Sequence, residues 1–301
     1  MIKTLTLSLL LLFFGSNLLF AQNYESGKSY FDAEHWTEFI PGDMPLVISV
    51  PHGGAIVDKD IPVRSCPGAV TVMDNRTIEL AREIQNAFLK RHGHRPYIII
   101  SNISRKNVDQ NREIEIGTCG NAIAARPWNA FHDYIDTALA MAVKKYGSAI
   151  YIDLHGQGHP NQRLEVGYNL RPAELPAVSE GGDLSKLAEK SSLNNKLVMD
   201  PKANFKELMI GDNAFGTLMA AAGSPAIPSK QDPFISDGGA YFNGGYNTRR
   251  YTGANYLKVF GWQIESNFKG VRDAEHAPEF AARFADVMIK YIELNTKIKL
   301  K

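Results

Sequence analysis

The sequence has no excess of charge of either sign and no repeated or low-complexity stretch. Its 33 Lys and Arg residues nearly balance 32 Asp and Glu residues in a chain of 301. This balance argues against a nucleic-acid scaffold and gives no general attraction to anionic membranes, so we expect no nucleic-acid partner. Hydrophobic residues make up 44% of the chain, which excludes collagen-like and disordered classes and is typical of a globular protein with a sizeable core.

Several catalytic signatures are absent as well. The chain contains no Gly-x-Ser-x-Gly elbow, no Walker loop and no His-Glu-x-x-His motif. The segment Gly156–Gly158 lacks the third glycine of a dinucleotide fingerprint. These absences argue against a serine esterase, a P-loop protein, a metalloprotease of the His-Glu-x-x-His type and a Rossmann dehydrogenase.

Cysteine is scarce, with Cys66 and Cys119 the only two in the chain. Two isolated cysteines without Cys-x-x-Cys spacing are weak candidates for a zinc site. In an oxidising compartment they could form a disulfide, provided that their Cα atoms come within bonding range. Two buried free thiols are the alternative, and the sequence favours neither.

Only the N-terminus carries a long apolar run. Lys3 precedes the run Leu5–Phe14, and Ala21 follows a weaker apolar stretch. This order is typical of a secretory signal peptide. We therefore expect residues 1–21 to be removed and residues 22–301 to form a single catalytic domain, periplasmic or secreted, with no stable membrane anchor. The alternative is an uncleaved anchor helix, which the Gly-Ser-Asn interruption after Phe14 disfavours.

Short apolar runs rich in β-branched residues alternate with amphipathic helical patterns. The runs predict strands at Leu46–Val50, Tyr97–Ile103, Ala149–Leu154 and Lys258–Ile264. The helical patterns predict one helix from Asp74, as its N-cap, to His92, and two more over Trp128–Tyr146 and Pro278–Leu294. This alternation indicates an α/β sandwich with a mixed, largely parallel sheet.

The segment 171–203 differs from the rest of the chain. It is rich in Ser, Glu, Lys, Asn and Gly and contains no aromatic residue. We expect a surface excursion, either an ordinary solvated loop with a short helix or a lid over a substrate.

Polar residues follow the predicted strands directly. His52 lies just past the first strand, the stretch Arg105–Arg112 follows the second, His155 follows the third and Glu265 the fourth. In open α/β sheets, ligands bind outside the carboxyl ends of the strands. We therefore expect these groups to meet at one rim of the sheet.

His52 and His155 are the candidate metal ligands. Each is followed by glycine, which lets a ligand approach closely, and a catalytic zinc site needs about three protein ligands and an open position for water. Asp74 is the best third ligand, and Glu79, further along the helix, is a poorer one. We therefore predict Zn²⁺, and Mn, Co or Ni would accept similar ligands. The alternative is that both histidines are structural residues of the rim, held by hydrogen bonds.

Glu265 is the candidate catalytic base. A metal hydrolase needs a group that takes a proton from water, and an unpaired carboxylate at the end of an apolar strand would otherwise be costly. A salt bridge, for example to Arg272, is the alternative.

Arginines near the same rim are candidates for binding an acidic small-molecule substrate. Arg105, Arg112 and Arg249 could hold a carboxylate in bidentate geometry. Asp109 could orient Arg112 or a ligand histidine through a hydrogen bond. A structural ion-pair network within the loop is the alternative.

The stretch 237–251 contains four glycines and four aromatic residues. It predicts a flexible wall that faces the ligand, in which Gly245 offers a backbone N–H to an anion. A simple tight turn of a hairpin is the alternative.

Six pieces of the chain, taken together and in order, resemble the N-formylglutamate amidohydrolase family. These pieces are Val50–Gly54, Asp74, Ser104–Arg112, Asp153–Gly156, Phe242–Arg249 and Gln263–Glu265. The resemblance implies a three-layer α/β sandwich of the phosphorylase/hydrolase type, within the zinc exopeptidase-like proteins. The layout is also similar to that of zinc N-acetylmuramoyl-L-alanine amidases.

The same resemblance implies roles for individual residues. It implies that His52, Asp74 and His155 bind the metal and that Glu265 is the catalytic carboxylate. It also implies that the arginines face an acidic substrate, and those residues are Arg105, Arg112 and Arg249.

These observations predict an exported, metal-dependent amidohydrolase. It would use metal-activated water to cleave the amide of a glutamate-like N-formyl or N-acyl amino acid, or of a small peptide. One alternative is a zinc amidase or carboxypeptidase that acts on cell-wall peptides. Another is a non-catalytic periplasmic protein that binds carboxylates, and metal content separates it from the enzymes because a binder needs no zinc.

Overall fold

The structure is a computed structural model of the chain and describes residues 23–236 and 238–300. The predicted signal peptide, residues 1–21, lies outside this part of the chain. Within the described ranges, no helix is both long enough and apolar enough to cross a lipid bilayer.

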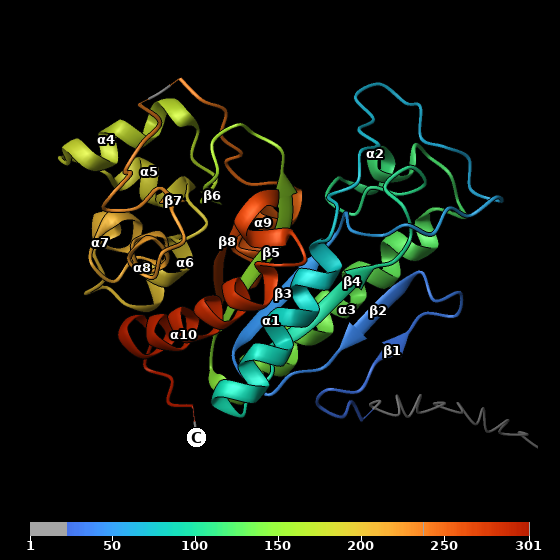
Figure 1. Cartoon of the computed structure of the whole chain (residues 1–301), viewed down its shortest axis with the longest axis horizontal. Helices are drawn as coiled ribbons and strands as arrows, with labels where there is room; N and C mark the ends of the chain where they lie inside the picture. The colour runs from blue at the N-terminus through green and yellow to red at the C-terminus, as the bar shows by residue number, and fades with distance from the viewer. Residues whose placement is uncertain (1–22, 237, 301) are drawn as a thin grey trace, which may run out of the picture.

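A sheet of eight strands runs through the molecule in the order β1-β2-β4-β3-β5-β8-β6-β7 (Figure 1). The strands β4, β3, β5 and β8 are mutually parallel, whereas β2 runs antiparallel to β4 and β6 runs antiparallel to β8. The mixed, largely parallel sheet of the prediction is therefore confirmed. The bounds are β1 Tyr30–Phe31, β2 Thr37–Ile40, β3 Leu46–Val50, β4 Tyr97–Ser101, β5 Ala149–Gln157, β6 Leu164–Gly167, β7 Ala226–Ile227 and β8 Val259–Asn267.

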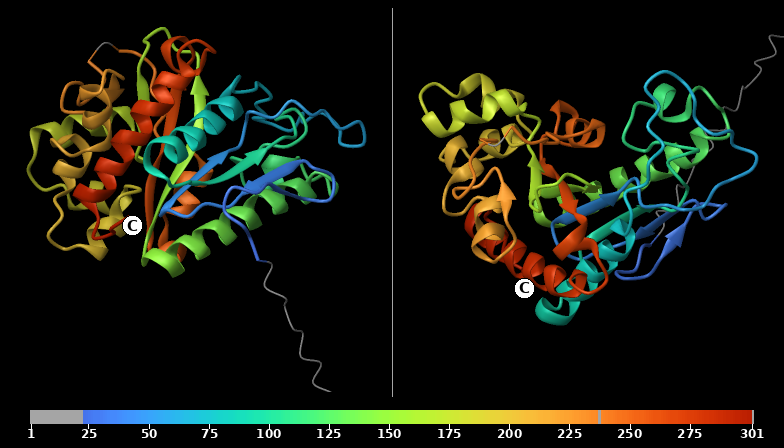
Figure 2. Two further views of the ribbon diagram at one scale, coloured as in Figure 1. Left: turned by 60° about the horizontal axis from the view of Figure 1, so that its bottom comes forward. Right: turned by 45° about the horizontal axis from the view of Figure 1, so that its top comes forward.

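Helices cover both faces of the sheet, which gives the molecule three layers (Figures 1 and 2). Helices α1 and α10 pack against each other over one face, and α3 packs over the other. The bounds are α1 Thr77–His92, α2 Ile114–Thr118, α3 Ala125–Tyr146, α4 Leu175–Glu180, α5 Ser185–Lys190, α6 Asn194–Met199, α7 Phe205–Ile210, α8 Phe215–Ala221, α9 Tyr246–Tyr251 and α10 Ala277–Asn295.

The alternation of residues along β5 decides which face carries polar side chains. Ile152 and Leu154 belong to the core cluster shared with α1 and α10, whereas Tyr151 belongs to the cluster shared with α3. Asp153 and His155 continue the set of Tyr151, because successive side chains of a strand point to opposite faces. On the α3 face, β5 therefore begins apolar and becomes polar toward its carboxyl end.

Two strands extend further than the apolar pattern predicts, β5 to Gln157 and β8 to Asn267. His155 and Glu265 consequently lie within strands rather than after them, and their Cα atoms are direct partners in the parallel ladder. The sequence pattern ends where the apolar side chains end, whereas the hydrogen bonds between the strand backbones continue through residues with polar side chains.

The prediction that Asp74 caps the following helix is wrong. Helix α1 begins at Thr77, after Arg76 in the left-handed conformation with φ of 64°, and no side chain caps it. The carboxylate of Asp74 instead accepts the backbone N–H of Gly156 at 3.2 Å. Asp74 is therefore directed toward the end of β5 rather than toward its own helix.

The segment 171–203 forms three short helices, α4, α5 and α6, in place of the predicted solvated loop with one short helix. Leu175, Val178 and Leu193 are buried in the same core cluster as Trp262 of β8. The loop prediction is wrong because a few apolar side chains anchor these short helices, while the abundant polar residues cover their outer sides. The role of this segment as a lid stays a prediction.

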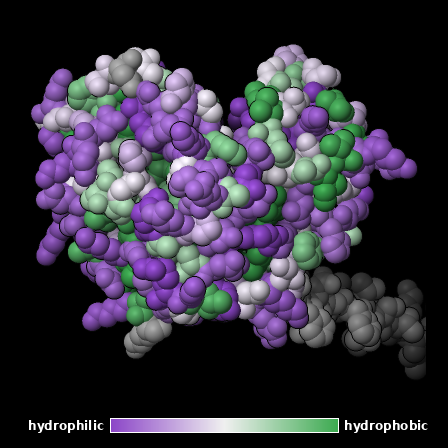
Figure 3. Space-filling view, viewed as in Figure 1, coloured by the Kyte–Doolittle hydropathy of each residue, from purple (hydrophilic) through white to green (hydrophobic). Residues whose placement is uncertain are grey.

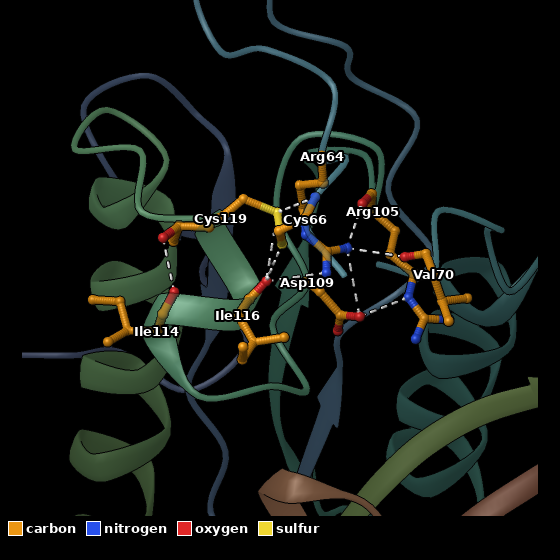
Figure 4. Close-up of a disulfide and its surroundings, with 9 residues drawn as sticks. Arg64, Cys66, Val70, Arg105, Asp109, Ile114, Ile116 and Cys119 are labelled. Atoms are coloured by element: carbon orange, nitrogen blue, oxygen red, sulfur yellow. Dashed lines mark hydrogen bonds and ion pairs between the residues drawn. A yellow bond between two sulfur atoms is a disulfide. The ribbon is translucent and has the colours of Figure 1, made fainter. Parts of the chain in front are cut away.

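Cys66 and Cys119 form a disulfide, with their Cα atoms 5.5 Å apart (Figure 4). The bond joins the long loop after β3 to the end of α2. Arg64 lies beside it and donates to one carbonyl of each segment, Val70 at 2.9 Å and Ile116 at 3.2 Å. Of the two alternatives that the sequence left open, the structure forms the disulfide.

The disulfide-linked loops and the helices α4–α8 stand on opposite sides of a hollow in the surface (Figure 3). The loops carry several exposed apolar side chains, which are Ile56, Val57, Val63, Val70, Val72, Met73, Ile116 and Ile123. The carboxyl ends of the central strands lead toward this side of the molecule (Figure 1).

Candidate active site

Three side chains that could hold a metal ion come together at the carboxyl end of the sheet. His52 follows β3, Asp74 lies in the loop before α1, and His155 lies near the end of β5. The Oδ2 atom of Asp74 is 3.5 Å from Nδ1 of His52 and 3.1 Å from Nδ1 of His155. The two imidazole rings are buried, with centroids 4.8 Å apart. The structure thus brings the three predicted ligands together.

Each histidine turns its other ring nitrogen toward a buried carboxylate. Nε2 of His52 lies 2.7 Å from Oδ1 of Asp109, and Nε2 of His155 lies 2.8 Å from Oδ2 of Asp153. An ionised carboxylate only accepts hydrogen bonds, so each Nε2 carries the hydrogen and the neutral ring has its lone pair on Nδ1. Both Nδ1 atoms face the same oxygen of Asp74.

The two supporting carboxylates are themselves held in place. Asp109 accepts a hydrogen bond from Nε of Arg105 at 3.0 Å, and Nη1 of Arg64 lies 3.6 Å from the same oxygen. Asp153 accepts the hydroxyl of Ser49 at 2.6 Å, from the neighbouring strand β3. Such outer hydrogen bonds fix the tautomer and orientation of ligand histidines.

Charge within the cluster shifts two pKa values in opposite directions. Burial alone would raise the pKa of Asp74, but the hydrogen bond from His155 and the nearby His52 hold it well below its usual range. Burial alone would lower the pKa of His155, but the charge of Asp153, with the hydrogen bonds that the ring donates to Asp153 and Asp74, raises it well above 6.5. The centre of the cluster therefore favours positive charge.

The donor set fits a divalent transition metal. Nδ1 of His52 is buried and has no hydrogen-bond partner within the described part of the chain, although buried polar atoms are normally paired. Two imidazole nitrogens and one carboxylate oxygen form a ligand set of catalytic zinc sites, in which a further position stays open. A further group of possible metal ligands, with one imidazole and two carboxylates, is formed by Asp273, Glu275 and His276, but it is more exposed.

Glu265 lies beside the cluster on β8. Its Cα pairs with that of His155, and paired residues of adjacent strands place their side chains on the same face. Its Oε1 accepts Nε2 of Gln263 at 2.8 Å, and burial raises the pKa of its carboxyl group. The carboxylate therefore stands next to the candidate ligands in a largely buried position.

The alternative salt bridge between Glu265 and Arg272 is not formed. The guanidinium of Arg272 donates instead to backbone carbonyls at the ends of β5 and β8, those of Gln157 at 2.8 Å and Ser266 at 2.9 Å. Gly156 lies against this guanidinium, since a Cβ placed on the glycine would come 2.4 Å from Cζ. Arg272 thus ties the strand ends together.

The predicted substrate arginines occupy different positions. Arg105 is buried against Asp109, and Arg112 is half-buried with its charge acting on the same carboxylate. Arg249 is exposed on α9 and lines a separate surface hollow between α6 and α9. The structure therefore brings Arg105 and Arg112 to the site but not Arg249.

Gly245 allows a close approach just before α9. A Cβ at this residue would come 2.3 Å from Nδ2 of Asn111, the same atom that lies 3.1 Å from Nε2 of His155. Asn111 also accepts the backbone N–H of Asn247 at 2.8 Å. The described residues of the stretch 237–251 end in helix α9, so the hairpin alternative is wrong, and the contact of Gly245 with an anion stays a prediction.

Sequence reasoning missed three residues that support the candidate ligands. Asp153 could have been found, because it precedes His155 by two positions on a strand and must point to the same face. Asn111 and Arg64 gave no such signal. Arg64 acts mainly through backbone carbonyls of distant segments, which no spacing pattern reveals.

Comparison with solved structures finds the same fold in N-formylglutamate amidohydrolase from Ralstonia eutropha JMP134, with a TM-score of 0.50 and 11% identity over 86% of this chain and 97% of that chain. A gene product of Agrobacterium tumefaciens has a TM-score of 0.49 and 12% sequence identity, over 84% of this chain and 91% of that chain. The apo form of the N-acetylmuramyl-L-alanine amidase of Mycobacterium abscessus has a TM-score of 0.36 and 13% sequence identity, over 83% of this chain and 97% of that chain. No family model matches the sequence, and no curated protein matches it. The first likeness confirms the predicted resemblance at the level of the fold.

Proposed function

We propose that this chain is a metal-dependent hydrolase of amide bonds, with zinc as the metal and an N-acyl amino acid or short peptide as the substrate. One observation carries the proposal: two buried Nδ1 atoms converge on one carboxylate oxygen, at 3.1 and 3.5 Å. Two further carboxylates hold the opposite nitrogens. The fold shared with a formylglutamate amidohydrolase supports the amide as the bond class.

His52, Asp74 and His155 would hold the ion. A divalent metal held there supplies, when bound, a Lewis acid that lowers the pKa of water and polarises a carbonyl. Asp109 and Asp153 keep the two rings turned with Nδ1 inward, which makes the ligands rigid before any metal arrives.

Glu265 would be the general base. It stands one strand from His155, a separation of about 5 Å between the two backbones. Because burial raises the pKa of its carboxyl group, the ionised form of Glu265 is a stronger base toward the proton of water. The same proton would then pass to the nitrogen of the leaving amine.

Arg112 is the residue that we assign to the carboxylate of the substrate. Its Nη1 donates to the carbonyl of Asn111 at 2.8 Å, which leaves guanidinium donors for a ligand. Arg105 is directed to Asp109 and Val72, so we assign it to the support of Asp109 instead. A guanidinium at this position would hold the substrate so that its carbonyl faces the ligand cluster.

We place the enzyme in the periplasm or outside the cell. The disulfide between Cys66 and Cys119 fits an oxidising compartment, and the apolar run after Lys3 fits secretion. Detection of the processed chain in a periplasmic or culture fraction, with a new N-terminus near Gln22, would support this assignment.

Metal analysis and turnover of point variants test the proposal. The zinc-reconstituted wild type should contain about one zinc per chain, and His155→Ala should lose it. Glu265→Gln should keep the metal and lose at least about 100-fold in kcat. His276→Ala, in the second His/Asp/Glu group, is the matched control and should keep both metal and turnover.

Two results would contradict the proposal. A wild-type chain that takes up no metal would favour a carboxylate-binding protein without chemistry. Full turnover by Glu265→Gln would remove Glu265 from the proposed mechanism.

A further inference from the structure

A second pair of polar residues lies on the same face of the sheet as the metal-ligand cluster. Glu165 of β6 is buried, and its Cα pairs with that of Glu265, which in turn pairs with that of His155. The three residues thus form one row across β5, β8 and β6, with their side chains on the same face. Adjacent strands lie about 4.8 Å apart, so Glu165 stands about 10 Å from His155.

Glu165 holds the imidazole of His159. Its Oε1 lies 2.7 Å from Nδ1 of His159, and its Oε2 accepts the backbone N–H of Phe242 at 2.7 Å. The ring of Phe242 stacks on the imidazole, with centroids 4.8 Å apart and planes inclined by 19°. The backbone N–H of His159 also donates to Oε1 of Gln157 at 2.5 Å. The ring is therefore held by Glu165 and Phe242, and the backbone that carries it is held by Gln157.

The other ring nitrogen of His159 is open to a ligand. The side chain is 21% exposed, and Nε2 has no hydrogen-bond partner among residues 23–236 and 238–300. Because Glu165 accepts the hydrogen of Nδ1, Nε2 of the neutral ring carries a lone pair and accepts an N–H. The buried carboxylate of Glu165 beside the ring favours an ammonium group over a second carboxylate at this position.

This pair and Arg112 lie on opposite sides of the metal-ligand cluster. The strand order β4-β3-β5-β8-β6 places the loop after β4, with Arg112, at one side. It places Glu165 and His159 at the other side, with His52 and His155 between them. An extended substrate that lies across the cluster would therefore have one end at Arg112 and the other end at His159.

We propose that His159, oriented by Glu165, binds a nitrogen donor on the acyl side of the scissile amide. The substrate is then a short peptide with a free amino group, because a formyl group has no atoms that reach this position. The inference rests on the proposed function and on the assignment of the leaving-group carboxylate to Arg112. It narrows the proposed substrates to short peptides and adds two residues that the proposed reaction does not itself require.

Two ligands that share one leaving amino acid test this proposal. Alanyl-glutamate carries an ammonium group on its acyl side, whereas N-acetyl-glutamate does not. Affinity is measured by calorimetry with the zinc-loaded Glu265→Gln chain, which binds without turnover. We expect alanyl-glutamate to bind more tightly, and His159→Phe, added to this background, to reduce the ratio of the two affinities about tenfold. Phenylalanine keeps the stacking on Phe242 and removes Nε2.

Two further variants complete the design. Glu165→Gln leaves His159 in place and changes only its partner, so the affinity ratio should fall in the same direction even if His159→Phe folds poorly. His276→Phe is the matched control on an exposed histidine and should leave the ratio unchanged.

The outcomes separate this proposal from the proposed function. An affinity ratio that neither His159→Phe nor Glu165→Gln changes would overturn the peptide assignment, even in an active amidohydrolase. Tighter binding of N-acetyl-glutamate by the Glu265→Gln chain would overturn it as well. A fall in the ratio without hydrolysis of either compound by the wild type would instead reject the proposed reaction and keep the binding role of His159.

Discussion

Arg272 shows how one side chain can hold several parts of this site. It donates to the carbonyls of Gln157 on β5 and Ser266 on β8, and also to that of Asn75, next to the candidate ligand Asp74. These carbonyls come from segments that are far apart in the sequence. Because Gly156 lacks a Cβ, the guanidinium can lie directly against the backbone that follows His155.

We expect Gly156→Ala to disturb the site through Arg272. The added Cβ would lie 2.4 Å from Cζ of Arg272, and the guanidinium cannot move without losing its carbonyl partners. Overpacking of this kind costs about 1–3 kcal/mol of unfolding free energy. Chemical denaturation and zinc titration should show lower stability and weaker zinc binding.

Gly158→Ala is the matched control for that experiment. A Cβ at Gly158 would meet no atom within 4 Å, although the residue lies only two positions further along the chain. Its stability and zinc affinity should equal those of the wild type. Equal behaviour of the two variants would show that Arg272 does not depend on the glycine.

At the residue scale, the sequence predicted the groups that carry chemistry better than the groups that position them. His52, Asp74 and His155 were predicted as a set and lie together, because their residue types and places at strand ends carry a signal. Arg249 has the right residue type but lies on the exposed side of α9. The position of Arg249 in the sequence, near other residues of the rim, therefore did not determine where its side chain points.

At the scale of elements, the disulfide-linked loops connect to the candidate ligands through a series of contacts. Arg64 lies two positions before Cys66, and its Nη1 lies 3.6 Å from Asp109. Asp109 in turn lies 2.7 Å from Nε2 of His52 (Figure 4 shows the first part of this series). A change in the position of the loop should therefore reach the orientation of a candidate ligand.

We expect the double variant Cys66→Ser/Cys119→Ser to lose stability and zinc affinity together. A disulfide that closes a loop of this length, with a separation of 53 residues, stabilises a protein by about 2–4 kcal/mol. Loss of support for Asp109 should also weaken zinc binding, by up to about tenfold. Thermal unfolding and zinc titration, with and without reductant on the wild type, measure both effects. A fall in stability with unchanged zinc affinity would show that the loop does not control His52.

Long elements with a clear apolar period were predicted closely, whereas the short helices of the segment 171–203 were not. The observed α10, Ala277–Asn295, is within one residue of the predicted helix at each end. Helices α4, α5 and α6 each have only 6 residues, so their apolar sides are too short to produce a recognisable period. Their place in the fold depends on contacts with β8 and its neighbours, which the local sequence does not contain.

At the scale of the whole molecule, stability should depend on pH through a buried histidine on α3. His132 is buried, with Nδ1 2.6 Å from the hydroxyl of Tyr251. Burial, and then the charge of Arg250, lower its pKa well below 6.5. The unfolded chain takes up the proton near pH 6.5, whereas the folded chain does so only at lower pH. The contribution of His132 is therefore complete above pH 6.5 and is lost as the pH falls.

We expect His132→Gln to reduce this pH dependence. Between pH 6.5 and 5, each buried neutral histidine removes up to about 1.4 kcal/mol of unfolding free energy per pH unit. Urea unfolding at pH 7 and pH 5 should show a smaller difference for the variant than for the wild type. The same loss in both proteins would place the acid sensitivity elsewhere.

Strand β5 contributes side chains to both the candidate site and the core, because successive residues point to opposite faces of the sheet. Asp153 and His155 face one side of the sheet, while Ile152 and Leu154, which alternate with them along the strand, face the α1 and α10 side. A slip of this strand by one position would exchange the two sets, exposing apolar residues to the site and placing charged ones in the core. A chain with that error could not be well packed, so catalytic activity would serve as a measure of correctly folded protein in a preparation.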